Sequence, residues 1–325
     1  MTSNHSSVAA DRVDRLFERI ENPVTKSTYA SKYRTLVGLA GEGKDWEYVL
    51  KSPKRMHALL KESYDQPATI ANYVTAVMAA YKGAEDLQCK HRKAYTEWKA
   101  IHASYKSQER ERYMQNEPTE SQKTNYVPLS EIEKKVESMA SDPEFDLSAV
   151  GQKTHMQFLM LNVILHINPK RADLGHVHIV KNPSLQKSLD DAKKNYIVFR
   201  KNSCTLVLNA FKTAATYTQI VEQLNDTFTK LLKKSLEALP RGFLFVDSKG
   251  KPYVKTNSYV QFVRRGFIDM FGKAAGVSLA RHAFINERVD FNRMSLSERD
   301  QIARSMGHSL STQEMYKWKN YDKQQ

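Results

Sequence analysis

Five polar residues in the second half of the chain have types that could together act on a phosphate ester. In chain order they are Arg171 in NPKRADLG, Lys212 in NAFKTAA, Arg281 in SLARHAF, His308 in MGHSLS and Tyr316 in QEMYKW. Arginine side chains stay charged at any working pH and bind anionic oxygens through paired hydrogen bonds. A tyrosine hydroxyl, with a reference pKa of about 10, is a poor nucleophile until neighbouring cations favour the phenolate. The set therefore contains anion binders, a nucleophile and proton donors.

Other familiar chemistries lack their motifs. The sequence contains no GxxxxGK[ST] phosphate loop, no GxGxxG after an expected strand, and no HExxH or CxxC pair. His176 and His178 have alternate spacing, but without a third ligand we interpret them as strand or loop surface. Cys89 and Cys204 are too few for a disulfide framework or a thiolate cluster. We therefore expect no metal site and no cofactor.

Four of the five residues also have a purely structural interpretation. Arg171 could be an ordinary cation at a helix C-terminus, and Lys212 could be a solvated turn lysine. His308, after a glycine, could cap a helix, while Tyr316 could belong to an amphipathic core with Trp318. Taken singly, these are the commoner explanations. The order of all five residues along one domain favours a shared function.

The order and spacing of these residues resemble the tyrosine recombinase and phage-type integrase family. The resemblance covers the whole second half of the chain and, more loosely, helical TxxxY segments in the first half. Its most specific part is the end, where an Arg-His-x-Phe helix is followed by Gly-His-Ser and then by a tyrosine just beyond Ser-Thr. Tyr321 is a rival nucleophile, but the distance of Tyr316 from Gly-His is more typical of the family.

The resemblance implies a role for each residue. Tyr316 attacks phosphorus and forms a 3′-phosphotyrosyl link with a free 5′-hydroxyl. Arg171 and Arg281 stabilise charge on the non-bridging oxygens, which is commonly the largest catalytic contribution. Lys212 protonates the leaving 5′-oxygen, and His308 donates to a phosphate oxygen or assists proton transfer. Since the phosphotyrosine retains the energy of the bond, rejoining requires neither ATP nor metal.

The sequence departs from the family pattern at one position. The family often has His-x-x-Arg before the second arginine, and here Ser278 occupies the histidine position. A serine hydroxyl can donate a hydrogen bond but cannot act as a charged acid at neutral pH. Asp173 resembles the acidic residue that follows the first arginine of the family, and could orient a guanidinium or cap a helix. Ser278 and His282 are further candidate site residues.

The elements that would position these residues are mostly helical. Twelve glycines in 325 residues lie below average usage, and prolines are sparse. Apolar periodicity predicts helices over residues 25–41, 69–81, 85–112, from 130 onwards, and over 152–167, 226–239, 256–271, 279–289, 295–306 and 312–318. Residues 196–199 and 204–208 predict a hairpin, and residues 217–221 a third strand, with Lys212 in the turn between. We expect a mainly α fold with a small antiparallel β-sheet.

Composition and length predict two domains and an anionic partner. The net charge of +14 and the pI near 9.5 favour polyanions. No apolar run reaches the roughly 18 residues of a membrane helix, and the first residues lack the apolar core of a secretory signal. We expect a helical core-binding domain over residues 1–114, a flexible polar linker over 115–126 and a catalytic domain over 127–325.

A basic, aromatic stretch in the first half is the candidate DNA-binding surface. Tyr95 and Trp98 interleave with basic residues, of which we select Lys90, Arg92, Lys93 and Lys99. On its own, such a stretch is more often a solvated helix face over an aromatic core stripe. With the recombinase resemblance, it predicts a DNA clamp that holds phosphates.

The resemblance implies a site-specific recombinase or integrase acting on double-stranded DNA as a homo-oligomer, a tetramer on its target. Such a protein acts inside the cell, with DNA in the nucleus or cytoplasm and without a membrane. We expect a mobile-element or viral integrase, with a chromosomal resolvase as another possibility. Two other functions remain open: a type IB topoisomerase, which shares the chemistry but acts as a monomer, and a DNA-binding protein that has lost turnover.

Overall fold

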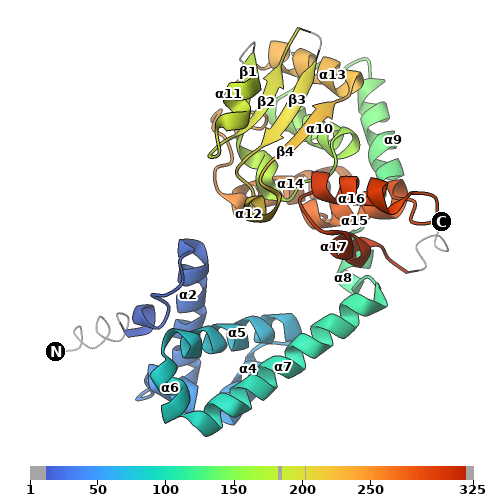
Figure 1. The fold of residues 1–325 in the computed structure, drawn as a ribbon. Helices are drawn as coiled ribbons and strands as arrows, with labels where there is room; N and C mark the ends of the chain where they lie inside the picture. Colours follow the sequence, from blue (N-terminus) through green and yellow to red (C-terminus); the bar gives the residue numbers. More distant parts are fainter. Residues whose placement is uncertain (1–11, 182–184, 202, 320–325) are drawn as a thin grey trace. The chain divides into compact units, whose positions relative to one another are not determined.

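The computed structural model describes residues 12–181, 185–201 and 203–319 (Figure 1). The chain divides into two compact units, Met1–Gln115 and Asn116–Gln325. Among the described residues, no helix is long and apolar enough to cross a membrane.

The first unit is helical where it is described. Its elements are α2 (Pro23–Ala40), α3 (Trp46–Lys51), α4 (Pro53–Ser63), α5 (Pro67–Gly83), α6 (Glu85–Lys90) and α7 (Arg92–Gln115). Helices α2, α4 and α5 each begin with a proline, whose fixed φ and missing N–H suit the first turn. Helix α7 packs on α3, α4 and α5, and the fully buried Tyr33, Leu50, Val77 and Trp98 lie in the core.

The single helix predicted over residues 85–112 is wrong, because the chain breaks at His91 between α6 and α7. The His91 backbone leaves the helical region (φ −117°, ψ 38°). Its Nε2 lies 2.9 Å from Glu47 Oε1, and the same oxygen accepts from Lys51 and Lys90. This tertiary contact fixes the break, and no local periodicity marks it.

The second unit surrounds a small sheet with helices. Before the sheet come α8 (Glu120–Asn125), α9 (Leu129–Ala140), α10 (Gln152–His166) and the 3-10 turn η1 (Ala172–His176). The sheet region contains β1 (Val177–Lys181), α11 (Leu185–Asp190), β2 (Asn195–Phe199), β3 (Cys204–Leu208), α12 (Ala214–Tyr217) and β4 (Ile220–Leu224). After it come α13 (Asp226–Ala238), α14 (Thr256–Phe271), α15 (Val277–Arg288), α16 (Leu296–Ser305) and α17 (Leu310–Tyr316).

The mainly α fold with a small sheet is confirmed, and the sheet is mixed rather than antiparallel. The strand order is β1-β2-β3-β4; the predicted β2–β3 hairpin is present, but β1 pairs parallel to β2. The third predicted strand is displaced: residues 214–217 form α12, Thr218 takes a left-handed φ of 56°, and β4 begins only at Ile220. The parallel strand β1, which contains His178, is absent from the sequence-based expectation.

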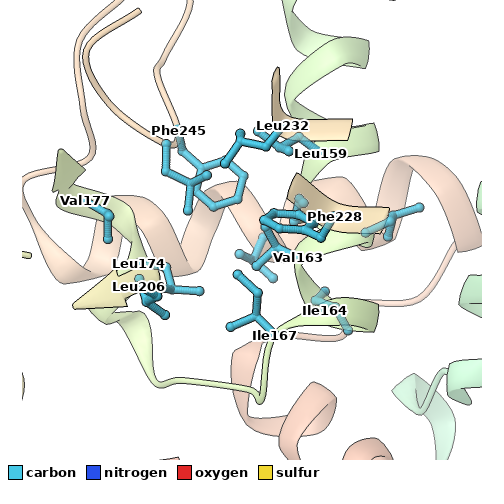
Figure 2. Close-up of a cluster of buried hydrophobic side chains, with 14 of the residues drawn as sticks. Leu159, Val163, Ile164, Ile167, Leu174, Val177, Leu206, Phe228, Leu232 and Phe245 are labelled. Atoms are coloured by element: carbon cyan, nitrogen blue, oxygen red, sulfur yellow. The ribbon is translucent and has the colours of Figure 1, made fainter. Parts of the chain in front are cut away.

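The core of the second unit lies between the sheet and the helices α10 and α13. Every residue of α10 from His155 to Ile164 is buried, as expected for a helix that is apolar on all sides. Figure 2 shows Leu159 and Val163 of α10 close to Phe228 and Leu232 of α13. This rigid centre supports the loops and helices that carry the candidate site.

The segment predicted as a flexible linker, residues 115–126, contains the helix α8 and packs on the second unit. Thr119 and Gln122 form a reciprocal capping box that starts the helix. Asn125 Oδ1 accepts from the backbone N–H of Ala274 at 2.7 Å. Because the contacts of this segment are largely polar, its sequence lacks the apolar period that predicts a packed helix.

Candidate active site in the second unit

Three of the predicted site residues, Arg281, His308 and Tyr316, lie in direct contact. The guanidinium carbon of Arg281 lies 4.9 Å from the centroid of the Tyr316 ring. Arg281 Nη2 donates to His308 Nδ1 and to the carbonyl oxygen of Met306, the latter at 3.1 Å. The rings of His308 and Tyr316 stack with centroids 5.6 Å apart and planes 22° from parallel. Residues from α15, the α16–α17 turn and α17 thus form one cluster.

The turn between α16 and α17 positions His308. Helix α16 begins with a capping box formed by Ser295 and Glu298 and ends at Met306. Gly307 then takes a left-handed φ of 68°, which glycine adopts without steric cost. The His308 N–H returns to the carbonyl of Ala303 at 3.1 Å, and Ser309 caps the N-terminus of α17. The Gly-His-Ser sequence is therefore a helix–turn–helix junction that directs the imidazole inward.

Burial and neighbouring cations keep His308 neutral. Its side chain is nearly fully buried, and burial, followed by the charges of Arg281 and Arg171, lowers its pKa to about 3. Since a guanidinium can only donate, Nδ1 must be the acceptor and the ring proton must be on Nε2. His308 can thus donate a hydrogen bond at neutral pH, but as an uncharged imidazole. The two roles expected for His308 are donation to a phosphate oxygen and assistance of proton transfer, and this arrangement favours the first.

Two buried donors in the cluster have no hydrogen-bond partner among the described residues. They are Arg281 Nε and His308 Nε2. A buried N–H without a partner costs roughly 1–3 kcal/mol, and native proteins contain few of them. Both donors lie on side chains in contact with Tyr316, and each can donate to an oxygen atom of a bound anion.

Arg171 and Asp173 lie close enough to this cluster to shift the pKa of Arg281. Burial lowers the pKa of Arg281, and the positive charge of Arg171 lowers it further. The pKa of Asp173 is raised by burial and held down by Arg171 and by a hydrogen bond from the Lys212 backbone. Arg171 is partly buried at the start of η1, so the loop after α10 brings its charge to the cluster.

Lys212 reaches the site through its loop rather than through a contact of its ammonium group. The next residue, Thr213, donates from Oγ1 to the carbonyl of Gly307 at 2.8 Å, directly before His308. The Lys212 side chain is exposed. The β3–β4 connection therefore lies against the His308 turn and leaves Lys212 accessible to a ligand.

Lys170 is a buried cation behind the site that the sequence analysis missed. Its side chain is 1% exposed and pairs with Glu222 of β4, and its Nζ donates to the carbonyl of Ser305 at 2.5 Å. Asn168 extends the network: its backbone N–H donates to the Glu222 carboxylate, and its Nδ2 donates to the Ser305 hydroxyl. The network joins the Arg171 loop, the sheet and the end of α16. In sequence, Lys170 is simply one more basic residue, and no motif distinguishes it.

His282 and Ser278, the two further candidates, differ in their environments. Ser278 is exposed, one turn before Arg281. His282 is buried, and its Nδ1 donates to the carbonyl oxygen of Tyr316 at 2.8 Å. Its Nε2 then accepts from Gln122 Nε2 at 3.3 Å. Burial lowers the pKa of His282 to about 4, so it is a neutral contact of the Tyr316 backbone.

The remaining sequence predictions fall elsewhere. The rival nucleophile Tyr321 lies outside the described residues. No group of three or more potential metal ligands occurs in the described part of the chain. In the first unit, Trp98 is fully buried, whereas all four selected basic residues are exposed: Lys90, Arg92, Lys93 and Lys99. Lys90 also pairs with Glu47 at 2.7 Å.

Comparison with solved structures gives distant likenesses, of which one is a recombinase. The chain is similar to the crystal structure of XerA recombinase, with 14% sequence identity, a TM-score of 0.41, and coverage of 97% of this chain and 95% of that chain. No protein-family model matches the sequence, and no curated protein matches it.

Proposed function

We propose that the protein breaks and rejoins DNA strands as a tyrosine recombinase, through a 3′-phosphotyrosyl intermediate. The observation that carries this proposal is the contact of Tyr316 with Arg281 and His308, each of which has a buried N–H with no partner in the described part of the chain. A nucleophile beside two donors without partners is an arrangement suited to an anionic phosphodiester. The charge of Arg171 and the accessible Lys212 complete the set.

The proposed step exchanges one phosphoester for another. Tyr316 Oη forms a bond to phosphorus and gives its proton to water, while the bond from phosphorus to the 5′-oxygen breaks. Lys212 Nζ protonates that oxygen, and Arg171, Arg281 and His308 donate to the phosphate oxygens. Rejoining by a 5′-hydroxyl reverses the step, with no net consumption of ATP.

In this proposal, the first unit supplies affinity for the phosphate backbone. Lys51, Lys90, Arg92 and Lys93 surround a shallow hollow of about 410 Å³ at the start of α7. Together with Lys99, these side chains can bind phosphates without reading sequence. Strand exchange between two duplexes requires several copies of the chain, so we propose a homo-oligomer, a tetramer on DNA.

The second candidate function is DNA binding without turnover. The exposed Ser278, at the family's histidine position, is the observation that favours it. In this case Arg281 and His308 would still bind phosphate, but no covalent link would form.

Covalent capture on a pool of duplexes with a randomised centre tests the proposal without knowledge of the target. The protein is incubated with the pool, denatured and separated from free DNA, and the DNA that remains attached is sequenced. We expect wild type to retain an enriched sequence at its 3′-phosphate ends, and Tyr316→Phe to retain none. Wild type that retains no DNA but still binds the pool would favour the non-enzymatic function. Relaxation of a supercoiled plasmid without exchange between two duplexes would indicate a topoisomerase.

A further inference from the structure

Helix α17, which carries Tyr316, is short and buries few of its own residues. It is seven residues long, and Gln313 is its only buried residue. Neither amide atom of Gln313 has a hydrogen-bond partner among the described residues. Short helices are marginal without packing or capping, so the position of α17 depends on contacts at its ends.

Asn116 supplies two of these contacts, one on each side of Tyr316. Its Nδ2 donates to the carbonyl oxygen of Glu314 at 3.2 Å, and its own carbonyl oxygen accepts from the Lys319 N–H at 2.8 Å. Asn116 is the first residue of the second unit and has a left-handed φ of 50°, which asparagine adopts more readily than most residues. One residue, 198 positions before Glu314, thus brackets the chain from 314 to 319.

Other residues hold the segment between these two contacts. The Tyr316 carbonyl accepts from His282 Nδ1 at 2.8 Å and from Asn286 Nδ2 at 3.3 Å. Trp318 is buried and stacks on His282, with ring centroids 4.6 Å apart. The backbone of Tyr316 is therefore fixed against α15, while Asn116 fixes the chain before and after it.

We propose that Asn116 is a positioning residue for Tyr316: it holds α17 in the orientation that keeps the phenol beside Arg281 and His308. This inference rests on the proposed function, because positioning matters only if Tyr316 reacts. Small displacements of a reacting group can reduce rates by as much as 10²-fold. The loss of a single hydrogen bond at this point should therefore affect cleavage more than overall stability.

Asn116→Gly separates the side-chain contact from the backbone conformation. Glycine permits the positive φ without strain, keeps the carbonyl that accepts from Lys319 and removes the side-chain donor to Glu314. Asn116→Ala would also strain the backbone, so it is the less informative change. The matched control is Asn125→Ala, which removes two side-chain hydrogen bonds of the same segment: the one from the Ala274 N–H and the one to the Ser121 carbonyl oxygen. Neither contact involves α17.

Two measurements on the full chain test the inference. Hydrogen exchange of peptides covering residues 310–319 reports on α17 independently of any activity. The rate of covalent adduct formation, in a single turnover on a nicked duplex of the captured sequence, reports on Tyr316. For Asn116→Gly we expect faster exchange in these peptides and roughly tenfold slower adduct formation. DNA affinity should be unchanged, and Asn125→Ala should change neither measurement.

The other outcomes separate the two proposals. Unchanged exchange for Asn116→Gly would overturn the inference, as would faster exchange with an unchanged adduct rate. If Asn125→Ala changed exchange and adduct rate as much as Asn116→Gly does, Asn116 would be one general stabilising contact among several. That result would also overturn the inference. Absence of any adduct with wild-type protein would overturn the proposed function and, with it, the role of Asn116 in the reaction.

Discussion

Two regions of the molecule place an aromatic residue near basic residues, and they differ in how their polar atoms are paired. In the first unit, the indole N–H of the fully buried Trp98 lies within 3.3 Å of the carbonyls of Val49 and Leu50. In the second unit, Tyr316 contacts Arg281 and His308, which are buried and each have one N–H without a partner within residues 12–181, 185–201 and 203–319. Completed hydrogen bonds indicate a structural role for Trp98, whereas the two donors beside Tyr316 are available to the anion that the proposed function requires.

The largest effect that tests this comparison is a loss of stability in the first unit. Trp98→Ala should lower its free energy of unfolding by about 3–5 kcal/mol, because it leaves a cavity and removes the indole donor, while the Leu50 carbonyl keeps the hydrogen bond from the Tyr81 hydroxyl. Urea unfolding followed by circular dichroism measures this loss. Protein that remains folded should bind DNA as wild type does. A variant of unchanged stability with weakened DNA binding would place Trp98 in the DNA interface instead.

The next effect compares two arginines of the second unit. Arg281→Lys keeps a positive charge but loses the fork of donors, and should slow adduct formation by about 10²–10³. Arg241 is the control, because its Nε, Nη1 and Nη2 all donate, at 2.8–3.1 Å, to oxygens of Ser235, Leu239 and Leu244. Arg241→Lys should reduce stability and leave the adduct rate of folded protein unchanged. Similar rates of adduct formation for Arg281→Lys and Arg241→Lys would contradict the distinction between a ligand-binding and a structural arginine.

The buried histidines of the site predict a pH dependence of stability. Both have a lowered pKa, about 4 for His282 and about 3 for His308, against an ordinary value of 6.5. The unfolded chain therefore binds more protons between pH 6.5 and about 4, and stability falls as the pH drops through this window. The slope should reach up to about 1.4 kcal/mol per pH unit for each histidine. Urea midpoints measured from pH 7 to pH 4.5 test this expectation.

His308→Gln is the matched variant for the pH measurement. A glutamine can accept from Arg281 and still donate, but it does not titrate. Its stability should therefore decline less steeply than that of wild type on acidification. Parallel curves for the two proteins would mean that His308 does not contribute to the acid sensitivity.

The smallest expected effect concerns the basic face of the first unit. Replacing Lys90, Arg92, Lys93 and Lys99 together by alanine should weaken DNA binding across sequences. For every phosphate that the variant no longer neutralises, the salt slope of log K should fall by about 0.9. Lys90 should contribute least, because Glu47 already pairs with it at 2.7 Å. An unchanged slope would show that these side chains do not contact DNA phosphates.

Strong apolar periodicity made much of the fold predictable from the sequence. The bounds of α14 and β3 are those expected, and the start of α10 at Gln152 is also as expected. Helix α14 buries one apolar face and shows its period directly in the sequence, whereas α10 and β3 are buried on all sides and are marked by apolar runs whose lengths suit a helix and a strand. The same signal failed for β1, a five-residue strand whose parallel partner β2 lies 18 residues further along the chain.

Polar tertiary contacts explain most of what the sequence did not reveal. The break at His91 depends on Glu47, and the packing of α8 depends on residues such as Ala274. Lys170 can be buried because Glu222 and the Ser305 carbonyl, both distant in sequence, pair with its ammonium group. Arg281, His308 and Tyr316 could be selected from their motifs, yet the neutral state of His308 depends on the burial that the fold creates.

The most direct test of the central claim is to identify the residue that becomes linked to DNA. After covalent capture, nuclease and trypsin digestion leaves a nucleotide on one peptide, which mass spectrometry can identify. Cleavage after Arg304 and Lys317 gives a peptide with Tyr316, and Tyr321 falls in a different one, so the two tyrosines are distinguished. We predict a nucleotide joined through its 3′-phosphate to Tyr316. A nucleotide on Tyr321 or on any other residue, or no linked peptide from wild-type protein, would contradict the account.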